Sequence, residues 1–526
     1  MRKVNLLDCT LRDGGYVNNW QFGEDGIKGI IAKLSQTSIE MIELGFLKGD
    51  SYDPNRTLFP DVGSFRHVLE QKREDITYVG MLDMSAPVPM ERIPKFDGTS
   101  IDGIRVIFKK KKMDAAYEYC KYIKEQGYKV FVNFVSTDQY TDGEFIAGLE
   151  KFRDLHPYGV TIVDTFGMIK RKDFSRLVML ADHNLDDDVA LCYHAHNNLQ
   201  QAFENAQTMV EMNLDREISI DACVFGMGRG AGNLNLELFA GFMNETYGTN
   251  YQIAPMLEIM DEYLEGFYRD KFWGYSLPLY LSASFGCHPN YAIFLAEKQT
   301  LSAKALREIL QSISAEDKVI FNKEAAEKYY KDYLEKYVDD VEAVGRLREE
   351  LGGKQVMLLA PGSSLSSSKD KIQAEIKKSQ RVVVAINFYD KSFDMNYVFC
   401  SNMRRLVKIS GKKDCKLIVT SNLQDSTGAD YIMNFSSYIS SEPAVVDNAG
   451  LMALRMLHAV GVQDVCVAGM DGYTEDGKNS YLDSSDKKYS LDYEERNKLI
   501  GSELVKMRGL MKMEFLTPTK YMKTDA

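Results

Sequence analysis

The feature that most constrains the fold is a regular alternation of short apolar runs with longer amphipathic runs over residues 3–248. Near-continuous apolar runs predict buried parallel strands, and the amphipathic runs predict helices that cover them. Eight such units in this length match a (β/α)8 barrel, whereas a doubly wound open sheet, the alternative, seldom has eight regular units. The predicted strands are residues 4–9, 41–46, 77–82, 103–108, 130–135, 160–164, 190–194 and 218–224.

Two further segments follow the predicted barrel. Residues 249–345 have helical patterns without strand alternation, which predicts a helical extension and linker. The alternation resumes at Lys354, so residues 354–526 predict a Rossmann-like α/β domain. The expected fold class is therefore α/β: an N-terminal TIM barrel over residues 1–248, a helical extension, and a second α/β domain.

The composition excludes several classes of function. A formal net charge of -12 argues against a nucleic-acid partner, which would require a basic face. No apolar stretch approaches the roughly 18 residues that a membrane span needs, and the N-terminus lacks a signal-peptide pattern. The eight cysteines form no CxxC pair, which fits buried free thiols in a reducing cytoplasm.

Two segments far apart in the chain could meet over one metal ion. Asp13 follows the first predicted strand, while His194 and His196 end the seventh. Residues i and i+2 of a strand share a face, and functional residues of a barrel lie at the carboxyl ends of its strands. Two imidazoles and a carboxylate suit Mn²⁺, Mg²⁺, Co²⁺ or Zn²⁺, with coordination positions left for a bidentate substrate. Single histidines are usually structural, but this pairing favours a metal site.

Other polar residues converge on the same predicted rim. Arg12 lies beside Asp13, where its permanent charge suits an enolate oxygen, although a structural salt bridge would also explain it. The glycine-rich residues 226–233 do not have Walker A spacing and predict a tight turn that brings Asn233 to the metal. Further rim residues are Glu43, Asn133, Asp164 and Thr165.

Three motifs resemble the DRE-TIM metallolyase superfamily over residues 1–300. They are Leu11-Arg12-Asp13-Gly14, His194-Ala195-His196-Asn197 and residues 228–233. The superfamily includes 4-hydroxy-2-oxoacid aldolases, hydroxymethylglutaryl-CoA lyase, and isopropylmalate and homocitrate synthases. The resemblance implies that Asp13, His194 and His196 bind the metal, with Asn233 as a further ligand, while Arg12 stabilises an enolate. The shared chemistry makes or breaks a carbon–carbon bond beside a metal-bound 2-oxoacid or its equivalent.

Within the superfamily, the chain is most similar to the 4-hydroxy-2-oxovalerate aldolases. Residues 226–233 resemble the aldolase segment GMGAGAGN and lack the loop cysteine of the acyl-CoA lyases. Where the aldolases have an acid/base histidine, this chain has Tyr16, which could donate a proton or simply pack over the barrel mouth. The expected catalytic residues are Arg12, Tyr16, Glu43 and Tyr291, and the expected substrate-binding residues are Asn133, Asp164 and Thr165.

The second domain contains a set of short motifs at residues 358–365, 385–388, 399–402, 468–473 and 479–483. These segments loosely resemble those of bacterial sialyltransferases, which bind a CMP-activated sugar. The turn after residue 361 precedes a predicted helix, and its backbone N–H groups could hold an anion. The resemblance implies nucleotide binding by Gly362, Ser363, Ser364, Asn387, Asn402 and Asp471. No residue matches a catalytic histidine, so nucleotide-sugar binding is better supported than glycosyl transfer.

Together these features predict a divalent-metal-dependent aldolase or lyase that uses a pyruvate-type enolate and an aldehyde, with Mn²⁺ or Mg²⁺ as the expected cation. The fused domain would bind a nucleotide-activated sugar, which suggests surface-polysaccharide synthesis by a cytoplasmic homo-oligomer. Two alternatives remain. One is a Claisen-type acyl-CoA lyase or synthase. The other is a non-catalytic barrel that carries a glycosyltransferase-like domain.

Overall fold

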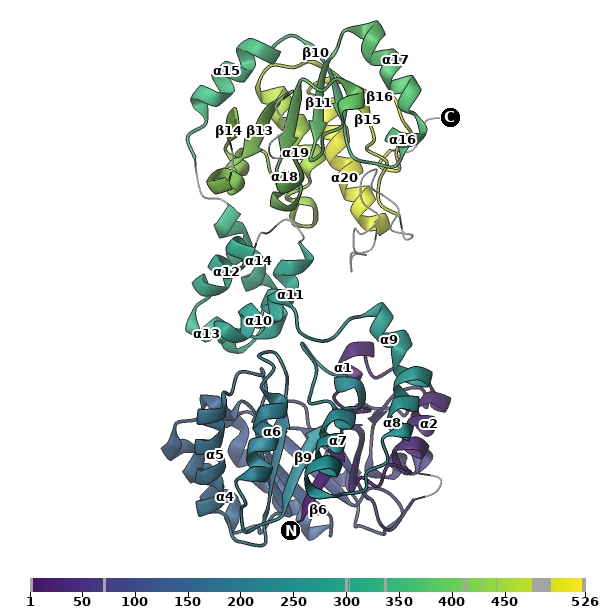
Figure 1. Cartoon of the computed structure of the whole chain (residues 1–526), viewed down its shortest axis with the longest axis vertical. Helices are drawn as coiled ribbons and strands as arrows, with labels where there is room; N and C mark the ends of the chain where they lie inside the picture. The colour runs from purple at the N-terminus through teal and green to yellow at the C-terminus, as the bar shows by residue number, and fades with distance from the viewer. Residues whose placement is uncertain are drawn as a thin grey trace. The chain divides into compact units, whose positions relative to one another are not determined.

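The computed structural model describes residues 3–69, 72–298, 301, 303–334, 338–409, 414–426, 428–440, 442–474 and 493–522. The chain divides into two compact units, Met1–Asn290 and Tyr291–Ala526 (Figure 1). Each unit contains one of the two predicted α/β domains, and the division falls within the predicted helical segment 249–345. Among the described residues, no helix has the length and apolar character needed to cross a membrane.

Eight parallel strands close into a barrel in the first unit. Strand β1 pairs with both β9 and β2, which joins the two ends of the sheet. The two-residue strand β3 (Leu58–Phe59) adds to β2. The barrel strands are β1 (Val4–Asp8), β2 (Met41–Leu47), β4 (Thr77–Asp83), β5 (Gly103–Phe108), β6 (Lys129–Phe134), β7 (Gly159–Asp164), β8 (Ala190–Ala195) and β9 (Ile218–Ala222). The predicted (β/α)8 class and its eight strands are confirmed.

Helices cover the outside of this barrel (Figure 1). Helix α4 shows why these segments are helical, because Thr141 and Glu144 form a reciprocal capping box at its start. The same helix buries Phe145, Leu149 and Phe152, one or two turns apart, against the strands. The helices of this unit are α1 (Gly15–Asn18), α2 (Glu24–Leu34), α3 (Met113–Glu125), α4 (Asp142–Arg153), α5 (Arg171–Asn184), α6 (Ala202–Glu211), α7 (Leu236–Tyr247), α8 (Ala254–Ile259), α9 (Glu265–Asp270) and α10 (Leu277–Ser284).

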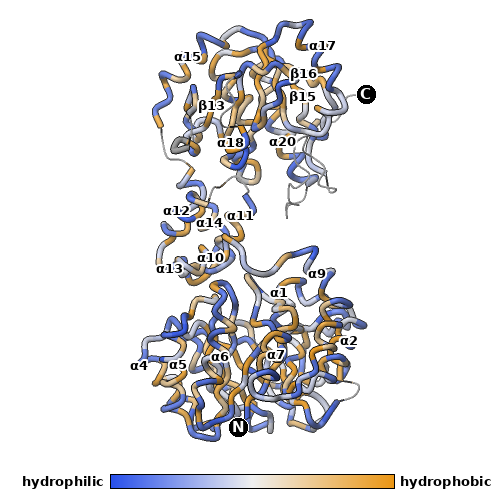
Figure 2. The backbone as a smooth tube through the Cα atoms, in the orientation of Figure 1, coloured by the Kyte–Doolittle hydropathy of each residue, from blue (hydrophilic) through white to orange (hydrophobic). Residues whose placement is uncertain are grey.

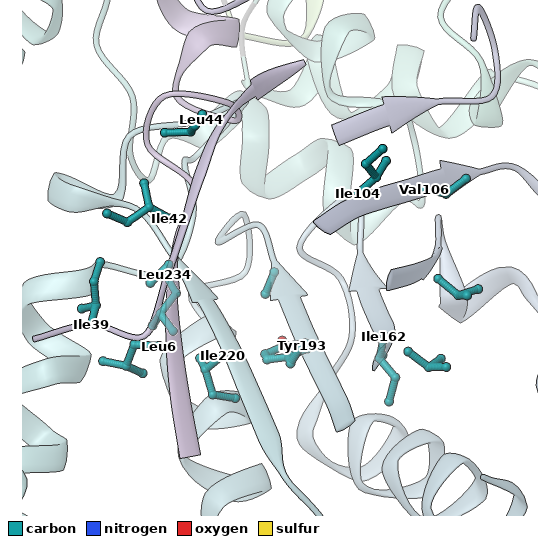
Figure 3. Packing of buried hydrophobic residues seen from close by; sticks show 14 of the residues in the cluster. Leu6, Ile39, Ile42, Leu44, Ile104, Val106, Ile162, Tyr193, Ile220 and Leu234 are labelled. Carbon is teal, nitrogen blue, oxygen red and sulfur yellow. The ribbon is translucent and has the colours of Figure 1, made fainter. Parts of the chain in front are cut away.

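Alternation along the strands separates the outer core from the barrel interior. Ile104, Val106 and Ile220 belong to the hydrophobic cluster shown in Figure 3. Their neighbours Arg105 and Asp221 must therefore point to the opposite face of the sheet, into the barrel. A second apolar cluster supplies part of that interior: Leu7, Cys9, Met41, Val79, Phe131, Ala190, Cys192 and Cys223. Charged side chains inside the barrel are thus held among apolar ones.

The second unit contains a seven-stranded parallel sheet in the order β14-β13-β12-β11-β10-β15-β16. Chain order reverses between β10 and β15, which makes this pair the topological switch point of the sheet. The strands are β10 (Gln355–Leu359), β11 (Val382–Ile386), β12 (Tyr397–Cys400), β13 (Lys416–Thr420), β14 (Tyr431–Met433), β15 (Asp464–Ala468) and β16 (Lys512–Phe515). The predicted second α/β domain is confirmed.

Ten helices described in the remainder of the chain complete the fold. In Figure 2, α15 and α17 are mainly hydrophilic along their length, as expected for helices with one face in solvent. Their bounds are α11 (Pro289–Glu297), α12 (Ala303–Ser312), α13 (Ala315–Val319), α14 (Lys323–Leu334), α15 (Val341–Leu351), α16 (Ser364–Ser367), α17 (Lys369–Ser379), α18 (Met403–Ile409), α19 (Ala449–Ala459) and α20 (Tyr493–Arg508).

Candidate active site

Three side chains that can bind a metal ion meet at the carboxyl ends of the barrel strands. Asp13 follows β1, and His194 and His196 come from the end of β8. One ligand atom of each lies within 4.8 Å of the others, and all three residues are buried. Nε2 of His194 is 3.4 Å from Oδ2 of Asp13, and the centroids of the two imidazole rings are 5.4 Å apart. The structure thus brings together the three predicted metal ligands.

Asn233 completes this cluster from the segment after β9. Its Nδ2 donates to Oδ1 of Asp13 at 2.9 Å and to the carbonyl of Met227 at 3.0 Å. Its Oδ1 and Nδ1 of His196 are buried and have no hydrogen-bond partner among the described residues. Such buried polar atoms normally have a partner, so their state points to a bound group. Two imidazoles, a carboxylate and an amide oxygen fit a divalent cation such as Mn²⁺ or Mg²⁺.

The protonation states of two of the ligands, Asp13 and His196, suit cation binding. Burial would raise the pKa of Asp13, but Arg12 and the two histidines outweigh it and hold that pKa well below its usual range. Burial lowers the pKa of His196 to about 4, helped by the neighbouring His194, Arg229 and Arg12. Asp13 is therefore ionised and His196 neutral at physiological pH, as metal ligands must be.

A carboxylate behind His194 fixes the orientation of its ring. Nδ1 of His194 is 3.1 Å from Oδ2 of Asp221, which points inward from β9. Burial alone would lower the pKa of His194, but its contacts with Asp13, Asp221 and Cys9 raise that pKa well above its ordinary value. Carboxylates that hold the second nitrogen of a ligating histidine set its tautomer and strengthen its metal binding.

Asp221 belongs to a buried chain of ion pairs across the barrel. Arg105, which is 1% exposed, contacts Asp221 through Nη2 and Oε2 of Glu43 through Nη1 at 3.0 Å. The same oxygen of Glu43 accepts from Nε of Arg12 at 2.7 Å, and Nη1 of Arg12 contacts Asp13. Glu43, predicted as catalytic, therefore lies where it orients Arg12 and Arg105.

Gly228 allows the glycine-rich segment to pass directly over the ligands. A Cβ at this position would collide with Nδ2 of Asn233 and lie 3.0 Å from Oδ1 of Asp13. A larger residue would therefore displace one of these two side chains and disturb the hydrogen bond between them. The predicted tight turn that brings Asn233 to the ligands is therefore present.

Tyr16 lies on α1, three residues after Asp13. Its ring packs edge-on against Trp20 and Phe46, with centroid distances of 4.9 and 6.1 Å. Burial and the charge of Asp13 raise the pKa of Tyr16 to about 12, so the phenol stays protonated at neutral pH. Its hydroxyl makes no hydrogen bond with any residue that the structure describes. Tyr16 can therefore act as a proton donor, while its ring packs as an aromatic cover.

The three predicted substrate-binding residues have partners within the protein. Oδ1 of Asn133 accepts a hydrogen bond from Thr161 at 2.7 Å inside the barrel. The carboxylate of Asp164 accepts from the N–H groups of residues 168 and 169, and burial raises its pKa to about 7. Oγ1 of Thr165 accepts from the N–H of Ser136 at 2.7 Å. These contacts shape the loops after β6 and β7, and a role in substrate binding stays a prediction.

Tyr291 belongs to the second unit and is fully buried there. Its hydroxyl donates to the carbonyl of Ile320 at 3.3 Å and accepts from the N–H of Asn322 at 3.3 Å. Its ring packs edge-on against Phe321. The structure therefore assigns Tyr291 contacts within the helical segment, and its catalytic role stays a prediction.

The nucleotide-binding residues predicted in the second domain gather at the switch point. Gly362 to Ser364 follow β10 and Asp471 follows β15, and Asp471 accepts hydrogen bonds from the N–H of Ser364 at 2.7 Å and from the hydroxyls of Ser363 and Ser364. The N–H groups that were expected to hold an external anion thus hold a carboxylate of the chain itself.

Two predicted amides lie at the ends of the neighbouring strands. Oδ1 of Asn387, after β11, accepts from the N–H of Ser401 at 3.1 Å, and Oδ1 of Asn402, after β12, accepts from the N–H of Arg404 at 2.9 Å. The predicted segment 479–483 lies outside the described residues. Nucleotide binding at this edge stays a prediction.

Comparison with known proteins agrees with the geometry of the barrel. Residues 3–260 match the model of the HMGL-like family. The barrel domain belongs to the HMGL-like family. The predicted relationship to the DRE-TIM metallolyases is therefore confirmed for this part of the chain, and members of the HMGL-like family include lyases. The match ends at residue 260, so it does not extend to the second domain.

Individual relatives of this HMGL-like domain have modest identity. Oxaloacetate decarboxylase from Mycobacterium tuberculosis is 25% identical over 238 residues, which are 45% of this chain and 68% of that protein. 4-Hydroxy-2-oxovalerate aldolase from Thermomicrobium roseum is 26% identical over 244 residues, 46% of this chain and 66% of that protein. A crystal structure of the N-terminal domain of a Bacteroides vulgatus protein described as an aldolase is 26% identical, covers 56% of this chain and 96% of its own, and has a TM-score of 0.49.

Sequence reasoning missed three charged residues of the site: Arg105, Asp221 and Arg229. Arg105 and Asp221 each interrupt an apolar strand at an inward-facing position, a signal that could have identified them. Arg229 is the one charged residue within the glycine-rich segment 226–233. Its surroundings are described below.

Proposed function

We propose that the barrel is a divalent-metal-dependent aldolase that makes or breaks a carbon–carbon bond through the enolate of a 2-oxoacid such as pyruvate, with an aldehyde as the second reactant. The observation that carries the proposal is the buried cluster of Asp13, His194 and His196 with the acceptor Oδ1 of Asn233 beside it. Membership of a lyase-containing family supports the same reaction class.

Arg12 has one group free for the substrate. A cation held by Asp13, His194 and His196 would polarise the oxygens of a bound 2-oxoacid as a Lewis acid. Nε and Nη1 of Arg12 are fixed by Glu43 and Asp13, whereas Nη2 is buried without a hydrogen-bond partner among the described residues. A fixed, unsatisfied donor of this kind can stabilise the charge that develops on an enolate oxygen.

Tyr16 can supply the proton that bond formation requires. Addition of the enolate to an aldehyde leaves an alkoxide, a stronger base than a phenolate even when the pKa of Tyr16 is about 12. The phenolic proton can therefore pass to that oxygen, and the tyrosinate left behind regains a proton from solvent, because the phenol is the stable form at neutral pH. In the cleavage direction solvent, rather than the protonated Tyr16, takes the proton of the alcohol. Because the hydroxyl has no partner among the described residues, the donation breaks no existing hydrogen bond.

A second candidate reaction follows from the same protonated phenol. Tyr16 cannot act as a base at neutral pH, and decarboxylation requires none. A 2-oxoacid with a carboxylate on C3 would lose CO₂, leave the same enolate, and take up one proton at C3. The similar protein from M. tuberculosis is named oxaloacetate decarboxylase, which is a reaction of this kind.

Proton NMR in D₂O tests the proposal on the full chain. Pyruvate with Mg²⁺ should lose its methyl signal, because a bound dication would acidify C3 enough for solvent to take its proton, and EDTA or Asp13→Asn should abolish the loss. Asp154→Asn, which changes an exposed carboxylate at the end of α4, serves as the matched control and should exchange normally. Oxaloacetate added separately distinguishes the two candidates by release of CO₂. Exchange that persists in Asp13→Asn would refute the proposed metal site.

We further propose that the edge of the second sheet at β10 and β15 binds a nucleotide-activated sugar. Ligands of open α/β sheets bind at such switch points, and Ser363, Ser364 and Asp471 meet there. Since Asp471 already holds the N–H of Ser364, a phosphate would be repelled at that position. Asp471 is better suited to accept hydrogen bonds from ribose or sugar hydroxyls.

Calorimetric titration of the full chain with CMP, CDP and UDP tests this second proposal. Binding should weaken by about 10-fold in Asp471→Asn, since a charged acceptor becomes a neutral one. Asp370→Asn, at the start of α17, provides a carboxylate control in the same domain. Absence of binding by all three nucleotides would reject the proposal.

A further inference from the structure

The barrel mouth contains a positively charged side chain, that of Arg229, to which the proposed reaction assigns no role. Arg229 follows Gly228, whose backbone lies against Asp13 and Asn233. Its guanidinium is 5.8 Å from the centroid of the Tyr16 ring, the proposed proton donor. It also contributes to the lowered pKa of His196. Arg229 therefore lies beside the ligand cluster and the proposed acid.

The charge of Arg229 is not neutralised by the part of the chain that the structure describes. By contrast, Arg12 contacts the carboxylates of Asp13 and Glu43. Arg229 makes no ion pair with any described residue and is half-buried. Its hydrogen-bonding contact is between Nη2 and Nε2 of His288. A partly desolvated guanidinium without a carboxylate partner is costly, and a bound anion would offset that cost.

The contact between Arg229 and His288 brings two hydrogen-bond donors together. Its Nδ1 accepts a hydrogen bond from the N–H of Asn290 at 3.2 Å, which places the proton of a neutral ring on Nε2. Burial lowers the pKa of His288 to about 3, together with the charges of Arg229 and Lys109, so the ring is neutral. Nε2–H then faces an N–H of Arg229. An acceptor at this point could bind both N–H groups.

The nearby carboxylates are already engaged. Asp13 is held by Arg12 and Asn233, and Oδ1 of Asp83, at the end of β4, accepts from the N–H of Ser85 at 2.8 Å. Lys109, which follows β5, adds a further positive charge near His288. The surroundings of Arg229 are thus positive on balance, which favours an external anion.

We propose that Arg229, together with His288, binds a second anionic group of the substrate, a carboxylate or a phosphate. This subsite rests on the proposed function, because it would bind the end of the substrate that is remote from the metal-bound 2-oxoacid group. Arg12 is left to the enolate, and the acceptor aldehyde is one that carries a negative charge. Charge-assisted hydrogen bonds from a guanidinium typically change affinity by about 10- to 100-fold.

Paired probes of equal length test the subsite by binding alone. The Mg²⁺-loaded full chain is titrated with 2-oxoglutarate and with 2-oxovalerate, which has the same five-carbon chain but no second carboxylate. Trp20, whose ring centroid is 4.9 Å from that of Tyr16, supplies a fluorescence signal at the site. The expected preference for 2-oxoglutarate is about 10- to 100-fold. 3-Phosphonopyruvate provides the phosphate-type arm of the same titration.

Variants assign the preference to Arg229. Arg229→Ala should make the two dissociation constants equal within about 2-fold, whereas Arg229→Lys should retain part of the preference because it keeps the charge. Arg153→Ala, an exposed arginine on α4, is the matched control and should keep the full preference. Equal affinity of the unchanged protein for both probes, or a preference that survives Arg229→Ala, would overturn the proposal.

Turnover separates this subsite from the proposed reaction. With pyruvate as donor, succinic semialdehyde should exceed butanal in kcat/KM by about the same factor as in binding, and only when Arg229 is present. If pyruvate shows no metal-dependent exchange while the Arg229-dependent preference for 2-oxoglutarate persists, the aldolase proposal fails and the anion subsite stands. If exchange occurs without that preference, the aldolase proposal stands and the subsite fails.

Discussion

Replacing Arg105 by methionine should destabilise the first unit through two buried carboxylates at once. Arg105 contacts both Glu43 and Asp221, and all three side chains are at most 1% exposed. Methionine fills similar space but leaves both carboxylates without their shared cation. Removing one partner of a buried ion pair costs about 3–5 kcal/mol, because the remaining charge stays desolvated.

The expected shift of the melting temperature follows from the size of the unit. At about 2.1 cal/mol/K per residue, a unit of 290 residues has an unfolding entropy of about 0.6 kcal/mol/K. A loss of about 4 kcal/mol therefore lowers the melting temperature by roughly 7 °C. Both tryptophans of the chain, Trp20 and Trp273, lie in this unit. Tryptophan fluorescence during heating in EDTA thus follows this unit alone.

Metal affinity distinguishes a specific effect of Arg105 on the metal ligands from the general loss of stability that follows removal of a buried arginine. Arg105 holds Asp221, and Asp221 orients His194. If Asp221 shifts in Arg105→Met, Mn²⁺ binding should weaken about 10- to 100-fold, measured by the electron paramagnetic resonance of free Mn²⁺. Arg216→Met removes another buried arginine, which pairs with Asp182 at 2.6 Å away from the ligands. It should lower the melting temperature and leave Mn²⁺ affinity unchanged. Equal Mn²⁺ affinities of the Arg105→Met protein and the parent would refute the reasoning.

Three further outcomes are expected. His196→Ala should abolish stoichiometric Mn²⁺ binding, measured by equilibrium dialysis, because it removes one of three clustered ligands; binding that survives would place the cation elsewhere. Tyr16→Phe should lower kcat for aldehyde addition by about 10²-fold or more, since the proton donor is lost, while pyruvate exchange in D₂O continues. Burial raises the pKa of Asp8 from 3.8 to about 7, so its ionisation destabilises the fold as pH rises from 4 to 7; Asp8→Asn should flatten the fall in melting temperature over that same interval.

The barrel and its ligand cluster could be predicted because both follow from local patterns. Parallel strands buried on both faces read as apolar runs, and His194 and His196 share a face through the two-residue period of β8. Asp13 could be assigned to the same rim because barrel strands end at one edge. These inferences require only the order of strands in the chain.

The ion pairs inside the barrel could not be predicted in the same way. Arg105 and Asp221 come from strands β5 and β9, and their meeting depends on the stagger and closure of the whole sheet. The role of Asp471 was missed for a similar reason, since its carboxylate reaches α16 only through the pairing of β10 with β15. The parts of the site that could not be predicted are those that depend on contacts across the sheet rather than along the chain.

The chain of ion pairs inside the barrel also fixes the charge that a cation meets. Asp13, Glu43 and Asp221 contribute three negative charges, and Arg12 and Arg105 contribute two positive ones. One negative charge is left over, and the raised pKa of His194, between Asp13 and Asp221, means that a proton balances it. A divalent cation that binds His194 must displace this proton. Loading the site is thus an exchange of one proton for a dication, which converts an electrically neutral interior into one with a single positive charge, ready for an anionic substrate.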